Sequence, residues 1–268
     1  MTAPGLQQSP VADALVVTWR NLKRIPRIPE LAVFAILQSI MFVLLFAFVF
    51  GGAIPLPGGG SYREYLMPGI FAQTLTFAAA TTAVGMTDDL AKGLIDRFRS
   101  LPMARSAFLA GRTLSDVVYN AGMLGVLMLA GLAVGWRVHG GLLRFLAGFG
   151  LAMAFSYAMS WVGVWLGQLV RTVEVAQQVT FVALFPLTFL SNAFVPTGTL
   201  PGWLQPVANW NPVSALVAAL RQLWGNPNPF AAHSFPGRHP VLLTLVEVAA
   251  IVAVFAPLGV RRYRSSSR

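Results

Sequence analysis

The side chains that commonly carry chemistry are scarce in this sequence and do not form catalytic patterns. A P-loop needs Gly-Lys followed by Ser or Thr, and neither Lys23 nor Lys92, the two lysines, follows a glycine. The three histidines, His139, His233 and His239, are not part of a His-Glu-x-x-His zinc motif. The chain also has no cysteine, which excludes thiolate catalysis and disulfides. These observations exclude an ATPase of the P-loop class and a zinc protease of the His-Glu-x-x-His class.

The amino-acid composition indicates that most of the chain lies in a membrane. Hydrophobic residues make up 56% of the 268 residues and charged residues only 10%, whereas soluble domains carry about 25% charged residues. The charges cluster, which leaves charge-free runs longer than the roughly 20 residues that cross a bilayer. We therefore predict an all-α membrane protein with one transmembrane domain over residues 1–268. The six predicted spans cover approximately residues 31–50, 66–87, 117–136, 142–167, 176–195 and 240–259.

The segment before the first span predicts a helix on the membrane surface. Over residues 11–28, apolar side chains recur at helical spacing and the bases form an opposite side. If both termini lie in the cytoplasm, most of the 19 Lys and Arg residues fall on the cytoplasmic side, as the positive-inside rule requires. We predict an even number of spans with both termini inside, and the net charge of +10 indicates contact with a membrane rather than with nucleic acid.

The stretch between the fifth and sixth spans is apolar but too interrupted for a seventh span. Four prolines divide it: Pro196, Pro201, Pro206 and Pro212. Asn211 followed by Pro212 has the pattern of a helix start, with an N-cap and a proline at the first helical position. Because so much apolar surface is costly in water, we expect short helices that re-enter the outer leaflet, with Trp203 and Trp210 at the headgroup level.

Two further patterns concern packing inside the membrane. Gly131-x-x-x-Gly135 and Gly163-x-x-x-Gly167 allow helices to approach closely, either within one chain or between two chains, and contact within one chain is the expected use. Asp116 and Glu174 fall at the cytoplasmic ends of predicted spans, where we expect water to reach them.

Several motifs resemble those of one transporter family. The signature of type-2 ABC exporter permeases of the daunorubicin-resistance branch is similar to two strings of this chain, Lys92-Gly-Leu-Ile-Asp-Arg-Phe-Arg-Ser-Leu-Pro-Met-Ala-Arg105 and Leu109-Ala-Gly-Arg-Thr-Leu-Ser-Asp116. Further matches in family order are Phe50-Gly-Gly-Ala-Ile54, Tyr65-Leu-Met-Pro-Gly-Ile70 and Phe185-Pro-Leu-Thr-Phe-Leu-Ser-Asn-Ala-Phe-Val-Pro196. The resemblance covers most of the chain and weakens after Pro227.

The resemblance implies a permease energised by another subunit. Such a permease pairs with an identical or related permease and binds two copies of a separate ABC ATPase, so MgATP belongs to the partner and this chain needs no cofactor. The family's coupling helix corresponds to residues 89–100, which can be helical up to the break before Pro102. Its predicted contact residues are Asp96, Arg97, Phe98 and Arg99. These residue types tend to dominate interfaces, although a solvated basic loop is the alternative.

The resemblance also implies export of amphipathic drugs or lipids across a bacterial inner membrane. Glu247 is the one acid well inside a predicted span, which makes it a candidate contact for a cationic substrate, with a buried structural pair as the alternative. The other candidates for the substrate path or an outer gate are Trp203, Trp210, Leu216, Gln38, Gln73 and Asn192. A plug that only seals the outer face is an alternative to a gate. An ion-coupled secondary transporter and an intramembrane enzyme remain alternatives, but the chain shows neither an internal repeat nor a convergent polar cluster.

Overall fold

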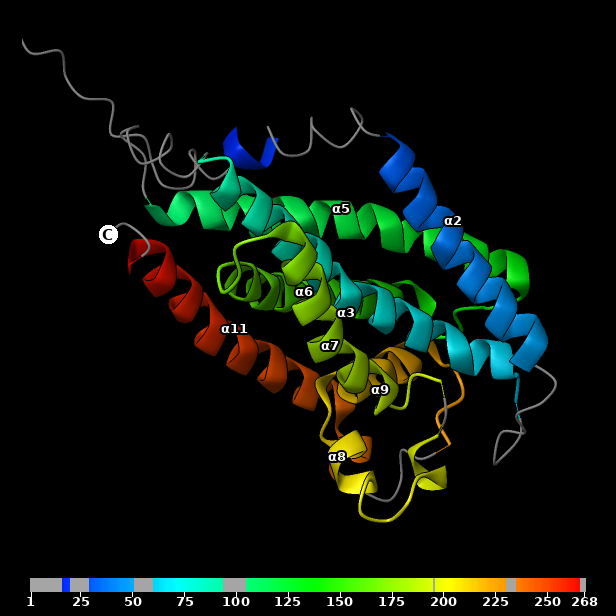
Figure 1. The fold of residues 1–268 in the computed structure, drawn as a ribbon. Helices are drawn as coiled ribbons and strands as arrows, with labels where there is room; N and C mark the ends of the chain where they lie inside the picture. The colour runs from blue at the N-terminus through cyan, green and yellow to red at the C-terminus, as the bar shows by residue number, and fades with distance from the viewer. Residues whose placement is uncertain are drawn as a thin grey trace, which may run out of the picture.

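The structure, a computed structural model, describes residues 16–19, 29–50, 60–93, 105–194, 196–229 and 235–265. Within these ranges it contains helices and turns but no strand (Figure 1). The longer helices are α2 (Pro29–Leu45), α3 (Tyr62–Ala91), α5 (Arg105–Val134), α6 (Gly141–Gly167), α7 (Val173–Phe189) and α11 (Pro240–Ser265). The shorter ones are η2 (Phe46–Phe50), η3 (Thr197–Thr199), α8 (Gln205–Asn209), α9 (Pro212–Trp224) and α10 (Phe235–Arg238).

The all-α prediction is confirmed, and four helices among the described residues are long and apolar enough to cross a membrane. These are Tyr62–Ala91, Phe108–Val134, Gly141–Gly167 and Pro240–Tyr263. The other two predicted spans correspond to shorter apolar helices. α7 has 17 residues, or about 26 Å at the usual helical rise, and α2 continues into the π-helical turn η2.

The helices extend beyond the segments that hydropathy marks. α5 begins at Arg105, although residues 105–112 were expected to belong to a loop, and α11 continues to Ser265. In contrast, α7 ends at Phe189, and the next residues form turns. A hydropathy pattern marks the membrane-embedded part of a helix, whereas backbone hydrogen bonding continues through charged residues such as Arg112.

α3 is the central helix and packs against α5, α6, α7 and α9. Its contact with α6 is close because Gly163 and Gly167 lie against the backbone of α3, where an added Cβ atom would collide with the carbonyls of Ala79 and Ala83. The hydroxyl of Thr87 also donates a hydrogen bond to the Gly167 carbonyl, with an O···O distance of 2.8 Å. The predicted close contact within one chain is therefore confirmed for Gly163 and Gly167. It is not found for the other motif, because an added Cβ atom would meet only side-chain atoms at Gly131 and nothing within 4 Å at Gly135.

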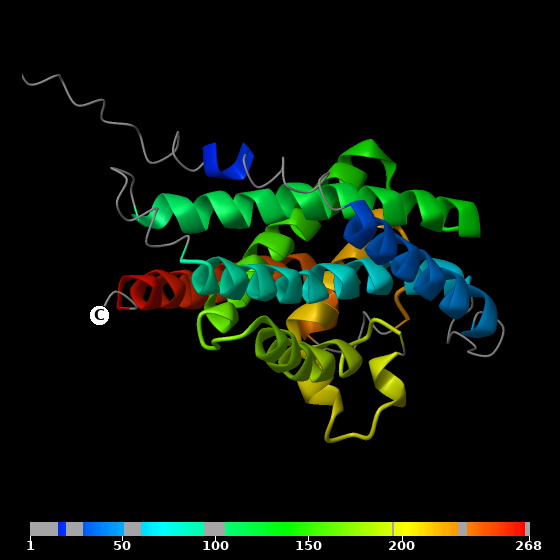
Figure 2. The ribbon, with the colours of Figure 1, turned by 45° about the horizontal axis from the view of Figure 1, so that its top comes forward.

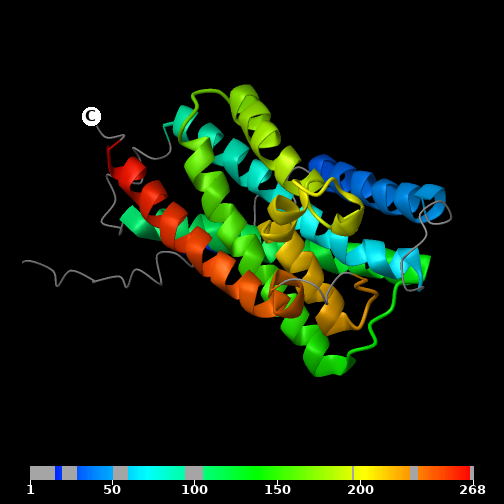
Figure 3. The ribbon, with the colours of Figure 1, turned by 90° about the horizontal axis from the view of Figure 1, so that it is seen from below.

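α9 lies between α3, α6 and α11 (Figure 3). The predicted start is confirmed, since the Asn211 side chain caps the helix by accepting a hydrogen bond from the Val213 N–H. Gly225 ends the helix with a φ of 73°, a left-handed conformation that favours glycine. Residues 213–221 and Trp224 are buried, so α9 belongs to the core of the chain.

One end of the molecule gathers the termini of several helices. The end of α3, the start of α5 and the end of α11 lie at the same side (Figures 1 and 2), where Met86, Phe108 and Tyr263 belong to one apolar cluster. Of the predicted surface helix over residues 11–28, only residues 16–19 are described. They are helical, and the Thr18 hydroxyl donates to the Gly111 carbonyl of α5 at 2.9 Å. We call this side the 94–104 end, after the segment that joins α3 to α5.

Candidate functional site

The predicted coupling residues fall between two described helices. Asp96, Arg97, Phe98 and Arg99 lie outside the described residues. The structure does describe the last turn of α3, which precedes residues 94–104, and the start of α5, which follows them. The candidate site is therefore built from the charged side chains of these two helix ends.

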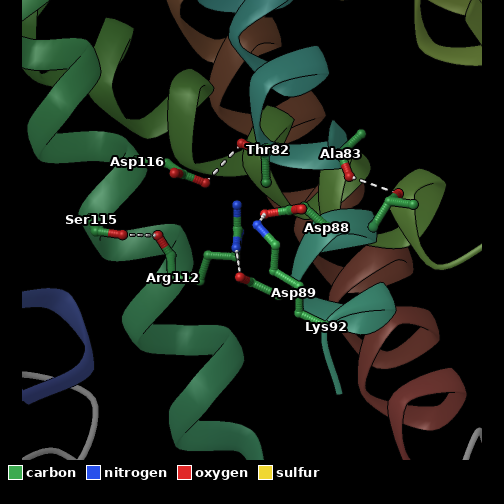
Figure 4. Close-up of polar contacts among 9 residues, drawn as sticks. Thr82, Ala83, Asp88, Asp89, Lys92, Arg112, Ser115 and Asp116 are labelled. Atoms are coloured by element: carbon green, nitrogen blue, oxygen red, sulfur yellow. Dashed lines mark hydrogen bonds and ion pairs between the residues drawn. The ribbon is translucent and has the colours of Figure 1, made fainter. Parts of the chain in front are cut away.

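A buried ion pair joins the two helices. Arg112 on α5 donates from Nη1 to Oδ2 of Asp89 on the last turn of α3, in a short contact (Figure 4). Both side chains are largely shielded from solvent. A buried ion pair holds its two elements in a fixed relation, because parting them would leave charges in a medium of low polarity.

A second carboxylate faces the same region. The Thr82 hydroxyl of α3 donates to Oδ2 of Asp116 at 2.7 Å, and Figure 4 shows Arg112 reaching between Asp116 and Asp89. Asp116 is half-buried, and it does not lie at the helix end where we expected it. The reason is the early start of α5, which places Asp116 inside the helix rather than at its first turn.

Gly85 provides the space that the guanidinium occupies. A Cβ atom at this position would collide with Nη2 of Arg112, so any larger residue would displace the guanidinium. We call Thr82, Gly85, Asp89, Arg112 and Asp116 the inner cluster. Within it, the Arg112 guanidinium pairs with Asp89 and extends toward Asp116.

The ion pair closest in sequence to residues 94–104, Lys92 with Asp88, lies at the end of α3 and is exposed rather than buried. Lys92 donates to Oδ2 of Asp88 at 2.7 Å, and the lysine side chain is exposed. Exposed pairs at this spacing contribute about 0.3–0.5 kcal/mol. The inner cluster, rather than this pair, fixes how α3 and α5 are placed.

The predicted substrate-path residues are not gathered in one place. Gln38 is exposed on α2, Gln73 is half-buried on α3, and Glu247 is half-buried on α11, where its Oε2 has no hydrogen-bond partner among the described residues. Trp203 and Trp210 are exposed near α8. Leu216 of α9, in contrast, is 0% exposed and packs in the hydrophobic core of the chain.

Two buried arginines were not recognised as site residues. The sequence does contain a signal for Arg112, because Arg112 and Asp116 stand four residues apart and so lie on one face of a helix. Arg221 lies between the fifth and sixth predicted spans, on the side that the proposed orientation places outside, yet it is 1% exposed on α9. The sequence hints at the burial of Arg221 in one way only, which is that Arg221 ends a long stretch without any charged residue.

Most of the chain matches a known family of transporters. Residues 13–224 match the ABC-2 type transporter family. The chain belongs to this family. The match includes the inner cluster and α9, and it ends before Glu247. The resemblance seen in the sequence motifs is therefore confirmed.

Curated relatives of this ABC-2 chain are drug-resistance permeases. The chain is 32% identical over 257 residues to the daunorubicin resistance ABC transporter permease protein DrrB1 of Streptomyces coeruleorubidus. The aligned region covers 96% of this chain and 88% of that protein. It is 27% identical over 272 residues to the probable doxorubicin resistance ABC transporter permease protein DrrC of Mycobacterium tuberculosis (strain ATCC 25618 / H37Rv). That alignment covers 98% of this chain and 94% of the relative. The chain is thus a multi-pass membrane permease of the ABC type.

Proposed function

We propose that this permease is the membrane subunit of an ATP-driven exporter that moves amphipathic drugs or lipids out of the cytoplasm or inner leaflet. The observation that carries the proposal is the inner cluster, which joins the two helices on either side of residues 94–104. The chain has no P-loop of its own, so a separate ABC ATPase, in two copies, would supply the energy. A second, identical or related permease would complete the complex in the inner membrane of a bacterial cell.

The inner cluster suits this role because it transmits movement to two helices at once. A force applied by an ATPase to Asp96, Arg97, Phe98 and Arg99 would act on residues 94–104. Since Arg112 and Asp89 hold α3 and α5 together, both helices would respond as one body. α3 also contacts α6, α7 and α9, so the movement would reach most of the chain.

The ATPase partner can be tested by purification. We expect an affinity-tagged permease, extracted in mild detergent from its native host, to retain an ABC ATPase subunit. Replacing Asp96 and Arg97 by alanine should lower the recovered ATPase at least about tenfold, as loss of interface anchors commonly does. Replacing Arg171, an exposed base in another loop, should leave recovery unchanged. Recovery of the permease without any ATPase, in membranes where both are present, would contradict the proposal.

We further propose six spans with both termini in the cytoplasm. In this arrangement α2 with η2 and the shorter α7 complete the six, and the 94–104 end faces the cytoplasm. α7 would span a locally thinned bilayer, because its length of about 26 Å is less than the usual hydrocarbon thickness of about 30 Å. Most Lys and Arg residues then lie inside.

The topology predicts which introduced cysteines react from outside. Because the chain has no cysteine, single replacements carry no background. A membrane-impermeant maleimide added to intact cells should label a cysteine at Trp203, which is exposed near α8, and should label a cysteine at Arg97 or Arg171 only after permeabilisation. Labelling of position 97, but not 203, in intact cells would show that the topology is reversed.

For the cargo path we propose Glu247 and the outer tryptophans. The unpartnered Oε2 of Glu247 supports a contact with a cationic group of the cargo. The exposure of Trp203 and Trp210 supports a position at the headgroup level, where they line the exit of the cargo. Gln38, Gln73 and Asn192 would add polar contacts along the path. Leu216 would meet cargo only if α9 left the core.

A further inference from the structure

We propose that Arg221 is a positioning residue that holds the outer side of the permease closed by fixing α9 to α3 and to the end of α7. The residues concerned are Tyr62, Tyr65, Asn192, Ala193 and Arg221, which we call the outer node. The direction of closure rests on the proposed topology, whereas the node itself rests on contacts within the chain.

The guanidinium of Arg221 binds carbonyl oxygens of two separate elements. Its Nε and Nη2 donate to the Tyr65 carbonyl of α3 at 3.0 and 2.8 Å. Nη2 also lies 3.0 Å from the carbonyl oxygen of Asn192 and 3.4 Å from that of Ala193, in the turn that follows α7. The guanidinium stacks on the Tyr65 ring, with Cζ 3.5 Å from the ring centroid. One side chain therefore joins α9, α3 and the 190–194 turn.

The charge of Arg221 makes this arrangement unusual. The side chain is 1% exposed, and in the part of the chain that the structure describes no ion pair joins it to a carboxylate. A buried cation is costly unless polar groups surround it, and here carbonyl oxygens and an aromatic face replace the carboxylate. Arginine suits the site because its planar fork of donors reaches several acceptors at once. The buried charge of Arg221 is stabilised in this way only while α9, α3 and the 190–194 turn stay together.

Other contacts of the outer node hold the same turn against α3. The Tyr62 hydroxyl donates to the Phe194 carbonyl at 3.2 Å, and the Tyr65 hydroxyl donates to the Asn192 carbonyl at 3.0 Å. Gly69 lets the turn come close, because a Cβ atom there would collide with the Ala193 carbonyl. Asn192 is half-buried, and its Oδ1 is a buried atom with no hydrogen-bond partner among the described residues.

α9 is also anchored to α7 and α6 by hydrogen bonds at its two ends. The Asn211 amide donates to the Leu187 carbonyl of α7 at 2.6 Å, and the Trp224 indole donates to the Phe145 carbonyl of α6 at 3.3 Å. Arg221 adds hydrogen bonds to α3, the helix that carries Asp89 at its opposite end. A displacement of α3 that begins at the inner cluster would therefore act on the outer closure through Arg221.

The test measures opening of the outer side without cargo or ATPase. A single reporter cysteine replaces Ser214, a buried residue of α9 whose hydroxyl accepts a hydrogen bond from the Asn192 N–H. Its reaction rate with an impermeant maleimide, added to intact cells, reports how often the node opens. We expect Arg221→Met to raise this rate about tenfold or more and Arg221→Lys to raise it less, because the lysine keeps the charge but not the fork. Arg144→Met removes an exposed arginine of α6 and should leave the rate unchanged.

Further variants keep the test decisive if Arg221→Met does not fold. Gly69→Ala keeps Arg221 but pushes the 190–194 turn from α3, so it should also raise the labelling rate. Gly202→Ala, where an added Cβ meets open space, is its control. The proposal is overturned if folded Arg221→Met, or folded Gly69→Ala where Arg221→Met is lost, labels at the original rate. Because the assay needs no transport, a failed export measurement would count against the proposed function and not against this closure.

Discussion

Replacing Arg112 by methionine is expected to abolish export and to lower the stability of the chain by about 3–5 kcal/mol, the usual effect of removing one partner of a buried ion pair. Arg112 pairs with Asp89 and extends toward Asp116, so its loss removes a positive charge from a region between α3 and α5 that holds both carboxylates. Thermal unfolding in detergent and drug efflux from cells measure the two effects.

The double variant Asp89→Asn with Arg112→Met removes both charges of the ion pair but keeps side chains of similar size at the two positions. We expect it to recover part of the lost stability, because it removes both charges of the Asp89–Arg112 pair while the Asp116 carboxylate stays in place. Export should recover less, since the two helices would no longer be held by charge. Lys92→Met is the matched control for an exposed pair and should cost no more than about 0.5 kcal/mol. If Arg112→Met behaves like Lys92→Met, the inner cluster does not hold α3 and α5 together.

Gly85→Ala tests the same cluster without changing any charge. The added methyl group would displace the Arg112 guanidinium, so export should fall in the same direction as in Arg112→Met. Alanine otherwise favours a helix by about 1 kcal/mol, and Gly122→Ala, where the Cβ meets open space, should show that benefit alone.

Asp96→Ala combined with Arg97→Ala should uncouple transport from ATP hydrolysis while the permease still inserts into the membrane. Loss of a carboxylate and a guanidinium from an interface commonly costs 2 kcal/mol or more, so we expect export and cargo-stimulated hydrolysis by the ATPase to fall by roughly 30-fold. Membrane content, measured by quantitative immunoblotting, controls for insertion. Normal export in this variant would mean that residues 94–104 only set topology.

The features that the sequence predicted correctly are those with local causes. An apolar run predicts a membrane helix because burial depends on each residue in turn, and Asn211 with Pro212 predicted the start of α9 because capping involves neighbouring residues. Gly163 and Gly167 predicted close packing for the same reason: four residues bring both to one helix face. The motif resemblance supplied the family, which the comparison then confirmed.

The features that the sequence did not predict depend on contacts between distant residues. Arg221 reads as a loop cation, and its burial depends on the Tyr65 carbonyl, 156 residues earlier in the chain. Arg112 was counted only as a base that sets topology, because a count of Lys and Arg does not detect its pairing with Asp89. The burial of Leu216 was not predicted either, because an interrupted apolar segment suggests a surface element, whereas α9 packs into the core; its role as a gate residue stays a prediction.

Transport into inverted membrane vesicles tests the central claim most directly. The vesicles contain the permease with or without its ABC ATPase, and daunorubicin, the drug named in a relative, serves as the probe. Our account predicts uptake that needs ATP and both subunits, that persists when proton and sodium gradients are dissipated, and that is lost in the Asp96→Ala, Arg97→Ala variant. Uptake by the permease alone, driven by an imposed proton or sodium gradient, would contradict it and would identify a secondary transporter.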